Sequence, residues 1–213
     1  VAKAVANALQ ACPDANAVLR FNTIYLRQTI DVSLLVIMED EGKVDLSSTK
    51  VNDIDKKSLV EIVDQVAEHV AKIRARKDKE LEKTRQSMKL IPAIFMNTFL
   101  KILAFFAYTL NLNLKWLGIP KDAFGGAVIT SIGSIGLDIG YVPLVPYTRV
   151  PSWVAPGAVT DEPVVVDGKV VPGKMLNLNA TFDHRIVDGG HAAILAKTMR
   201  ETLENPFENL DPL

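Results

Sequence analysis

The chain has 213 residues, 48% hydrophobic and 23% charged, a composition typical of a globular protein with one domain. Its 24 basic and 25 acidic residues leave a net charge of −1, which excludes the strongly basic surface of a typical nucleic-acid-binding protein. The single cysteine, Cys12, excludes a disulfide framework within the chain and a cysteine-built metal site, and we expect a cytoplasmic protein.

The N-terminal part predicts one helix followed by two strands. Residues 1–11 are rich in alanine, with apolar residues at helical spacing, and Pro13 ends the helix. This stretch lacks the charged start and long apolar core of a signal peptide, and because the chain opens with Val we expect a missing N-terminal segment. Residues 17–26 and 30–38 are rich in β-branched and aromatic residues and predict strands, with a polar turn over 39–42.

Residues 55–83 form the clearest helical pattern of the chain. Apolar residues recur every three or four positions along one stripe, and Ser58 or Asp55 can cap the first turn. The segment 74–85 is charged on all sides. It predicts a solvated helix end with intrahelical ion pairs, and the alternative is a binding arm for a partner protein.

Residues 90–117 are the most apolar part of the chain. Asn97 and Lys101 interrupt the segment, and its longest clean run, 102–110, is too short to span a bilayer. We predict an insertion over about 86–120 with one or two helices, docked on the domain or at a subunit contact. A helix lying on a membrane surface is the alternative.

The C-terminal half predicts strands and a final helix. Residues 124–136 form a β-type run punctuated by glycines, and 142–150 and 152–159 predict short strands. Residues 164–171 join two β-branched runs through Asp-Gly, which is typical of a hairpin. The remaining predicted elements are a strand over 175–182, a helix over 190–203 and a tail from Pro206.

The stretch Thr-Phe-Asp-His-Arg-Ile-Val-Asp-Gly-Gly occupies residues 181–190. It places His184 at a strand end, where a general base can face a cleft while its backbone stays fixed. The alternative is a hydrogen-bonded turn histidine, with Asp188 and Gly189 in an ordinary turn. The three histidines of the chain are far apart and no cysteine pair accompanies them, so we expect no metal site.

This stretch resembles the His-x-x-x-Asp-Gly signature of CoA-dependent acyltransferases. Its Asp-His-Arg form resembles the catalytic domain of the dihydrolipoamide acyltransferase subunit of 2-oxoacid dehydrogenase complexes. Residues 8–16 carry a similar Pro-x-x-Asn pattern, and residues 55–62 resemble the start of the family's long helix. Residues 125–131 resemble the family strand that carries a catalytic hydroxyl. The resemblance covers most of 1–78 and 124–210.

The resemblance implies an α/β fold, specifically an α+β two-layer sandwich of the chloramphenicol acetyltransferase type with a mixed sheet. It implies a single catalytic domain over residues 1–213 that lacks part of its N-terminus and contains the apolar helical insertion. No lipoyl domain or peripheral-subunit-binding domain is visible in the sequence. Residues 42–49 depart from the family loop that borders the substrate channel. These departures suggest a divergent, stand-alone branch of the family.

The resemblance also assigns roles to residues. Acyl transfer between thiols needs a base, which His184 supplies, and an oxyanion donor, which is Ser131 or, as second choice, Thr130. The alternative for Ser131 and Thr130 is that they are ordinary strand residues. Asp188 belongs to the catalytic set as the residue that holds the turn through a salt bridge. Structural support for the site comes from Asp183, Arg185 and Gly189.

The implied activity is transfer of an acyl group between coenzyme A and a dihydrolipoyl thiol. Coenzyme A is then a substrate, the lipoyl group arrives in trans, and no metal takes part. The resemblance implies a homotrimer, with larger assemblies possible, in which one chain supplies the histidine and its neighbour the hydroxyl. Lipoyl-bearing proteins of 2-oxoacid dehydrogenase complexes would be partners. Transfer to a small hydroxyl or amine acceptor and a non-catalytic trimeric scaffold are the open alternatives.

Overall fold

The computed structural model describes residues 1–40, 43–75, 91–115 and 119–210. Within these ranges, no helix has both the length and the apolar run needed to cross a membrane.

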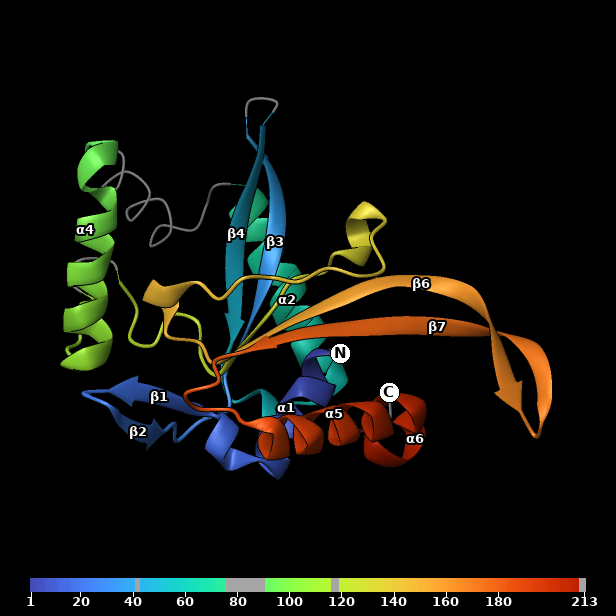
Figure 1. Ribbon diagram of the computed structural model, residues 1–213. Helices are drawn as coiled ribbons and strands as arrows, with labels where there is room; N and C mark the ends of the chain where they lie inside the picture. Colours follow the sequence, from blue (N-terminus) through green and yellow to red (C-terminus); the bar gives the residue numbers. More distant parts are fainter. Residues whose placement is uncertain (41–42, 76–90, 116–118, 211–213) are drawn as a thin grey trace.

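A five-stranded mixed sheet carries the fold, in the order β4-β3-β5-β6-β7 (Figure 1). β3 (Val32–Asp40) pairs antiparallel with β4 (Lys43–Val51), and β6 (Ser152–Val166) pairs antiparallel with β7 (Lys169–Phe182). The short strand β5 (Ala127–Ile129) lies between β3 and β6 and runs parallel to both. All three residues of β5 are buried, as expected where a parallel strand is covered on both faces.

A separate hairpin replaces the single strand predicted over residues 17–26. β1 (Ala17–Arg20) and β2 (Thr23–Leu26) pair antiparallel across a turn at Phe21 and Asn22. Both turn residues have positive φ, 47° and 60°, as in the two-residue turns that match the twist of a hairpin. The prediction was wrong because Asn22 is the only turn signal in an otherwise apolar run.

The segment expected as a channel-bordering loop at 42–49 forms most of strand β4. Its register with β3 runs unbroken from Val32 opposite Val51 to Asp40 opposite Lys43. Val32 and Val51 are fully buried, so the pairing is anchored in the core. The loop expectation was therefore wrong for the described part, while residues 41–42 of the predicted polar turn lie outside it.

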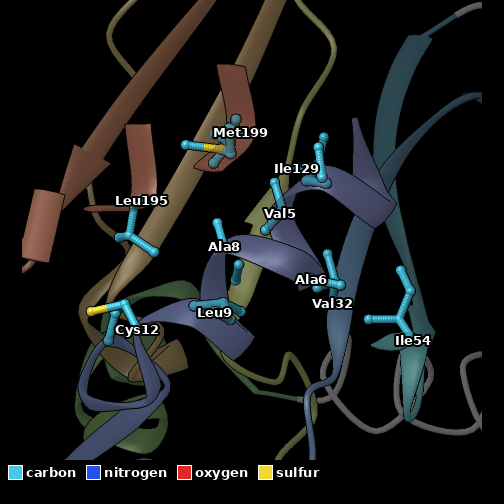
Figure 2. Packing of buried hydrophobic residues seen from close by; sticks show 14 of the residues in the cluster. Val5, Ala6, Ala8, Leu9, Cys12, Val32, Ile54, Ile129, Leu195 and Met199 are labelled. Carbon is cyan, nitrogen blue, oxygen red and sulfur yellow. The ribbon is translucent and has the colours of Figure 1, made fainter. Parts of the chain in front are cut away.

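The core lies where α1 (Ala2–Ala11) packs against α5 (Gly189–Glu204) and one face of the sheet. Both helices were predicted, and both are confirmed. Ala4, Ala6 and Ala8 of α1 are buried and small, so the two helices and the sheet can approach closely. Figure 2 shows five of the side chains at this contact, Val5, Ala8, Leu9, Leu195 and Met199.

The helix predicted over 55–83 begins later, as α2 (Leu59–Arg74). Ser58 caps it: the Ser58 hydroxyl accepts the Glu61 backbone N–H at 3.3 Å, and the Glu61 carboxylate accepts the Ser58 N–H at 2.8 Å. This reciprocal pair satisfies two donors that a helix start leaves open. Asp55 lies in a preceding 3₁₀ turn, and residues 76–83 of the prediction lie outside the described residues.

α2 rests on β4 with a face slightly rotated from the predicted stripe. Ile62 and Ile73 are buried, whereas Val63, which the pattern placed inward, is 63% exposed. His69 lies between α2 and β4, with its Nδ1 atom 2.9 Å from the Thr49 hydroxyl. A polar contact to the strand, rather than an additional apolar residue, completes this interface.

The apolar insertion contains α4 (Ala93–Ala104), which continues as a π-helical turn over Phe105–Thr109. The predicted helical character is confirmed for these residues, while 86–90 and 116–118 of the predicted insertion lie outside the described residues. Figure 1 shows α4 at the left of the view, above the outer end of the β1–β2 hairpin. Tyr108 anchors the turn in the domain, and its burial raises the pKa of its phenol, so the group stays neutral.

Two strand predictions in the C-terminal half were wrong or too long. β5 occupies only three residues of the run 124–136, which continues into a 3₁₀ turn at Gly133–Ile135. Residues 142–150 form no strand; they contain a 3₁₀ turn, Pro146–Thr148. Prolines lack the N–H that a ladder needs, and Pro143 and Pro146 both fall in this segment.

The predicted hairpin over 164–171 is confirmed as the tip of a long ribbon. Strands β6 and β7 include the predictions 152–159 and 175–182, and Asp167 and Gly168 form the turn with φ of 50° and 75°. A short helix, α6 (Pro206–Asn209), follows α5 where a tail was expected.

Removing a side chain from the core tests how much the α1–α5 contact stabilises the fold. Leu9 is 2% exposed, so we expect Leu9→Ala to lower the free energy of unfolding by about 2–5 kcal/mol. Leu137→Ala is the matched control, because Leu137 is 48% exposed and should change little. Urea unfolding of both variants gives the comparison, and equal midpoints would contradict the assigned core.

Candidate active site

His184 lies in the connection between β7 and α5, on a backbone held from both sides. The Asp183 N–H donates to the Pro151 carbonyl at 2.8 Å, and the Asp183 carbonyl accepts the N–H groups of Ile186 and Val187 at 2.9 Å each. Ile186 and Val187 are buried in the core, which anchors the end of the turn. The imidazole of His184 is exposed, so a fixed backbone presents a free side chain.

Asp183 and Arg185 flank the histidine and pair with each other. The Arg185 guanidinium donates from Nε to Oδ1 at 2.8 Å and from Nη2 to Oδ2 at 2.5 Å, a two-pronged contact. This guanidinium holds the pKa of Asp183 below its usual value, so the carboxylate is ionised at neutral pH. The pair bridges the two residues on either side of His184; the supporting role of both residues stays a prediction.

Asp188 caps α5. Its Oδ1 atom accepts the His191 backbone N–H at 2.9 Å, and the His191 Nδ1 atom lies 2.9 Å from the same oxygen. The backbone hydrogen bond from His191 lowers the pKa of Asp188, so the cap carries a negative charge at the positive end of the helix. A salt bridge was expected for Asp188. Among the described residues its charged partner is His191, and this contact is ionic only when the His191 imidazole is protonated.

Sequence reasoning missed the capping role of His191. A capping box is recognised by Glu or Gln three residues after the cap, and histidine at that position gives no such signal. Gly189, the first residue of the helix, has no atom within 4 Å of where a Cβ would lie. Space therefore does not require glycine at Gly189.

Ser131 and Thr130 lie just beyond the C-terminal end of β5. The Thr130 N–H donates to the Val154 carbonyl and the Ile132 N–H to the Pro156 carbonyl, both at 3.0 Å. These bonds fix the backbone on either side of Ser131, whose side chain is exposed, whereas Thr130 is half-buried. An exposed hydroxyl on a fixed strand end is a suitable hydrogen-bond donor to a ligand.

The sheet register separates this hydroxyl from the histidine. Ala127 pairs with Ser152, and Ser152 pairs with Phe182, so these three residues form one row across the sheet. Ser131 lies four residues beyond the row, roughly 13 Å at the rise of a strand. His184 follows Phe182 on the opposite side of the row. A single chain therefore does not bring His184 and Ser131 together.

Among the described residues, no three His, Cys, Asp or Glu side chains are grouped as a metal site requires. The charged groups near His184 are satisfied by each other or by backbone N–H groups, as described above for Asp183 and Asp188. The exposed imidazole of His184 is a group that can accept and return a proton.

Comparison with known proteins places this geometry in a family. A model of the catalytic domain of 2-oxoacid dehydrogenase acyltransferases matches residues 1–90 and 120–210. The lipoamide acyltransferase component of the branched-chain alpha-keto acid dehydrogenase complex of Pseudomonas putida is 41% identical over 88 residues, which are 40% of this chain and 20% of that protein. The chain thus matches about a fifth of that relative's length.

Solved structures share the fold. The crystallographic structure of the Azotobacter vinelandii dihydrolipoamide acetyltransferase, studied for the roles of a serine, a histidine and an asparagine in catalysis, superimposes with a TM-score of 0.67 and 21% identity, over 98% of this chain and 68% of that one. The cubic core of the pyruvate dehydrogenase multienzyme complex gives a TM-score of 0.68 and 20% identity over the same shares. The expected acyltransferase fold with its mixed sheet is confirmed.

The ion pair beside the histidine should make stability depend on pH. We expect Asp183→Asn to lower the free energy of unfolding at neutral pH by about 1 kcal/mol, because the Arg185 guanidinium loses its charged partner. The pKa of Asp183 is depressed in the folded state. The extra free energy of unfolding of the wild type over the variant is therefore fully present above the unfolded pKa of about 3.9. It is lost as the pH falls through the lower pKa of the folded state. Urea midpoints of both proteins between neutral pH and about pH 2 measure this, and a constant difference at every pH would contradict it.

Proposed function

Because the chain belongs to the 2-oxoacid dehydrogenase acyltransferase family, we propose that it transfers an acyl group between coenzyme A and a dihydrolipoyl thiol. The observation that carries the proposal is the turn at His184, where an exposed imidazole sits on a backbone tied to the core. Such a group can move a proton repeatedly without displacement of the surrounding structure.

His184 is the proposed general base. It takes the proton from the attacking thiol while the thiolate sulfur bonds to the thioester carbonyl carbon, which forms a tetrahedral oxyanion. Collapse of this intermediate breaks the bond to the other sulfur, which leaves as a thiolate and receives the proton from His184. No acyl-enzyme is formed, so the buried Cys12 has no part in the reaction.

Ser131 is the proposed donor to the oxyanion, with Thr130 as the second candidate. The exposed hydroxyl of Ser131 at the end of β5 supports the first choice, since Thr130 is half-buried. A hydrogen bond to the developing negative charge is worth more in the transition state than in the substrate, which is how such a donor raises the rate.

The separation of these residues supports a homotrimer in which each site is shared. Because His184 and Ser131 lie on opposite sides of one row of the sheet, a common substrate requires the histidine of one chain and the hydroxyl of another. The structural neighbour that forms a cubic multienzyme core supports assembly of this kind. The lipoyl group is proposed to come in trans, from a lipoyl-bearing protein of a 2-oxoacid dehydrogenase complex.

The Azotobacter vinelandii neighbour offers a parallel for the three positions. A serine, a histidine and an asparagine were studied for catalysis there, and the asparagine follows the histidine by four residues. In this chain Asp188 follows His184 by the same four residues and caps α5. We therefore treat Asp188 as a positioning residue for the histidine turn, and its carboxylate is occupied by the helix N-terminus.

Replacement of the base gives the direct test. We expect His184→Ala to reduce acetyl-CoA:dihydrolipoamide transfer by at least about 10², because no other group takes the thiol proton. His69→Ala is the matched control, since His69 lies on α2 and bonds to Thr49, and it should keep its activity. Unchanged turnover in the His184 variant would refute the assignment, and a folded but inactive wild-type protein would favour the scaffold or another acceptor.

Mixing two inactive variants tests whether the site is shared. Ser131→Ala should lose about 10²–10³ of the rate. Each variant alone is inactive, but co-expressed His184→Ala and Ser131→Ala chains should recover about a quarter of wild-type activity, because one in four neighbouring pairs then holds an intact histidine and an intact serine. A mixture as inactive as its components would show that the site lies within one chain.

A further inference from the structure

The insertion falls outside the part of the chain that matches the family. The two matched ranges end at residue 90 and resume at residue 120, and α4 lies between them. The helix docks one side on the domain, where Ala104 and Tyr108 are buried. Its other side remains open, so the insertion must serve something other than the family fold.

The open side of α4 carries large apolar side chains together with the polar residues of the helix. Ile94, Phe95 and Ile102 are 82%, 62% and 52% exposed and share one arc, with Thr98 between Ile94 and Ile102. The half-buried residues Met96 and Phe99 face the domain side, which is entirely apolar. Large apolar side chains gathered on the exposed side of a helix are found where an apolar phase or a partner covers them. In the single chain, solvent faces this surface.

The exposed surface continues beyond α4. The ring of Phe21, at the tip of the β1–β2 hairpin, meets the ring of Phe105 edge-on with centroids 6.4 Å apart, and Phe105 in turn contacts Phe106. All three rings are more than 40% exposed. We call this surface the insertion face; it consists of Phe21, Ile94, Phe95, Ile102, Phe105 and Phe106.

The charge of the surrounding sequence is entirely positive. Between Lys83 and Lys121 there are six basic residues and no Asp or Glu. The rest of the chain holds the other 18 basic residues and all 25 acidic ones, so it carries a net negative charge while this segment is positive. Three of the six, Lys101, Lys115 and Lys121, lie in the described residues and are exposed. The ion pairs found among the described lysines involve other positions, such as Lys50.

The position of Lys101 relates this charge to the apolar surface. At 100° per residue, Lys101 and Asn97 lie together at one margin of the exposed arc of α4, next to Ile94. From a margin, a lysine can lay its aliphatic stem along apolar surface and keep its ammonium group in a polar layer. An apolar helix face with a basic margin is the pattern of helices that lie in a membrane interface.

We propose that the insertion face binds the surface of a bilayer containing anionic lipid. Its rings enter the boundary between headgroups and acyl chains, and Lys101, at the margin of the face, reaches the lipid phosphates. A second copy of the same face fits less well, because an isologous contact would bring the basic margins of the two copies together. The proposal is independent of the acyl transfer.

Sedimentation of the full chain with lipid vesicles tests the proposal. We expect binding to phosphatidylcholine vesicles that contain phosphatidylglycerol, weaker binding to phosphatidylcholine alone, and release by salt. Lys101→Gln should weaken binding to the anionic vesicles about fivefold and leave binding to neutral vesicles unchanged. Phe95→Asp combined with Ile102→Asp should weaken binding at least about tenfold.

The matched control combines Val63→Asp and Phe207→Asp, which introduce the same charges on α2 and α6 at side chains that are 63% and 98% exposed. The control should bind vesicles as the wild type does, and all variants should retain acyl transfer if that function holds. Absence of wild-type binding to anionic vesicles would overturn the proposal. Binding of the Phe95/Ile102 double variant to anionic vesicles as tightly as the wild type would also overturn it. If the double variant changes oligomeric size and the wild type binds no lipid, the face is a contact between protein chains instead.

Discussion

The close packing of α1 between α5 and the sheet is the contact on which the rest of the fold depends. Ala4, Ala6 and Ala8 are at most 1% exposed, and larger side chains there would push α5 away from the sheet. The same helix reaches the start of α2, because the Lys3 ammonium donates to the carbonyls of Asp55 and Lys57 at 2.8 and 2.6 Å. α1 thus fixes α5, and α5 fixes the turn that precedes it.

In the turn at 183–188, some residues hold the backbone in place and His184 is accessible to solvent. Ile186 and Val187 point into the core, and Asp183 binds the backbone and Arg185, so each of them is committed to structure. His184 faces outward, and among the described residues no hydrogen bond or ion pair occupies its imidazole. The sheet then imposes a second constraint, since its rows keep the histidine and the hydroxyl of Ser131 on opposite sides of one chain. Shared sites between copies are a direct result of that register under the proposed chemistry.

Local features were predictable from the sequence and non-local ones were not. The helix α5, the Asp167–Gly168 turn and the motif around His184 each depend on a few adjacent residues. The strand β4 depends on pairing with β3, and the break at Phe21 depends on backbone angles that apolar residues rarely signal. The residues of the candidate site were found by their resemblance to a family motif, but their separation follows from pairing across three strands, which no local pattern encodes.

The outer part of the β6–β7 ribbon has little beyond its own two strands to support it. β5 pairs only with the first three residues of β6, the register shifts between Pro156 and Val159, and the arm extends away from the other elements (Figure 1). Val165 and Val170 are more than 70% exposed there. A two-stranded ribbon is marginally stable alone, so its amides can exchange with solvent through local opening that leaves the core closed. We expect the arm to open as a separate unit, and its exposed strand edges are where pairing with a strand of another chain would order it most.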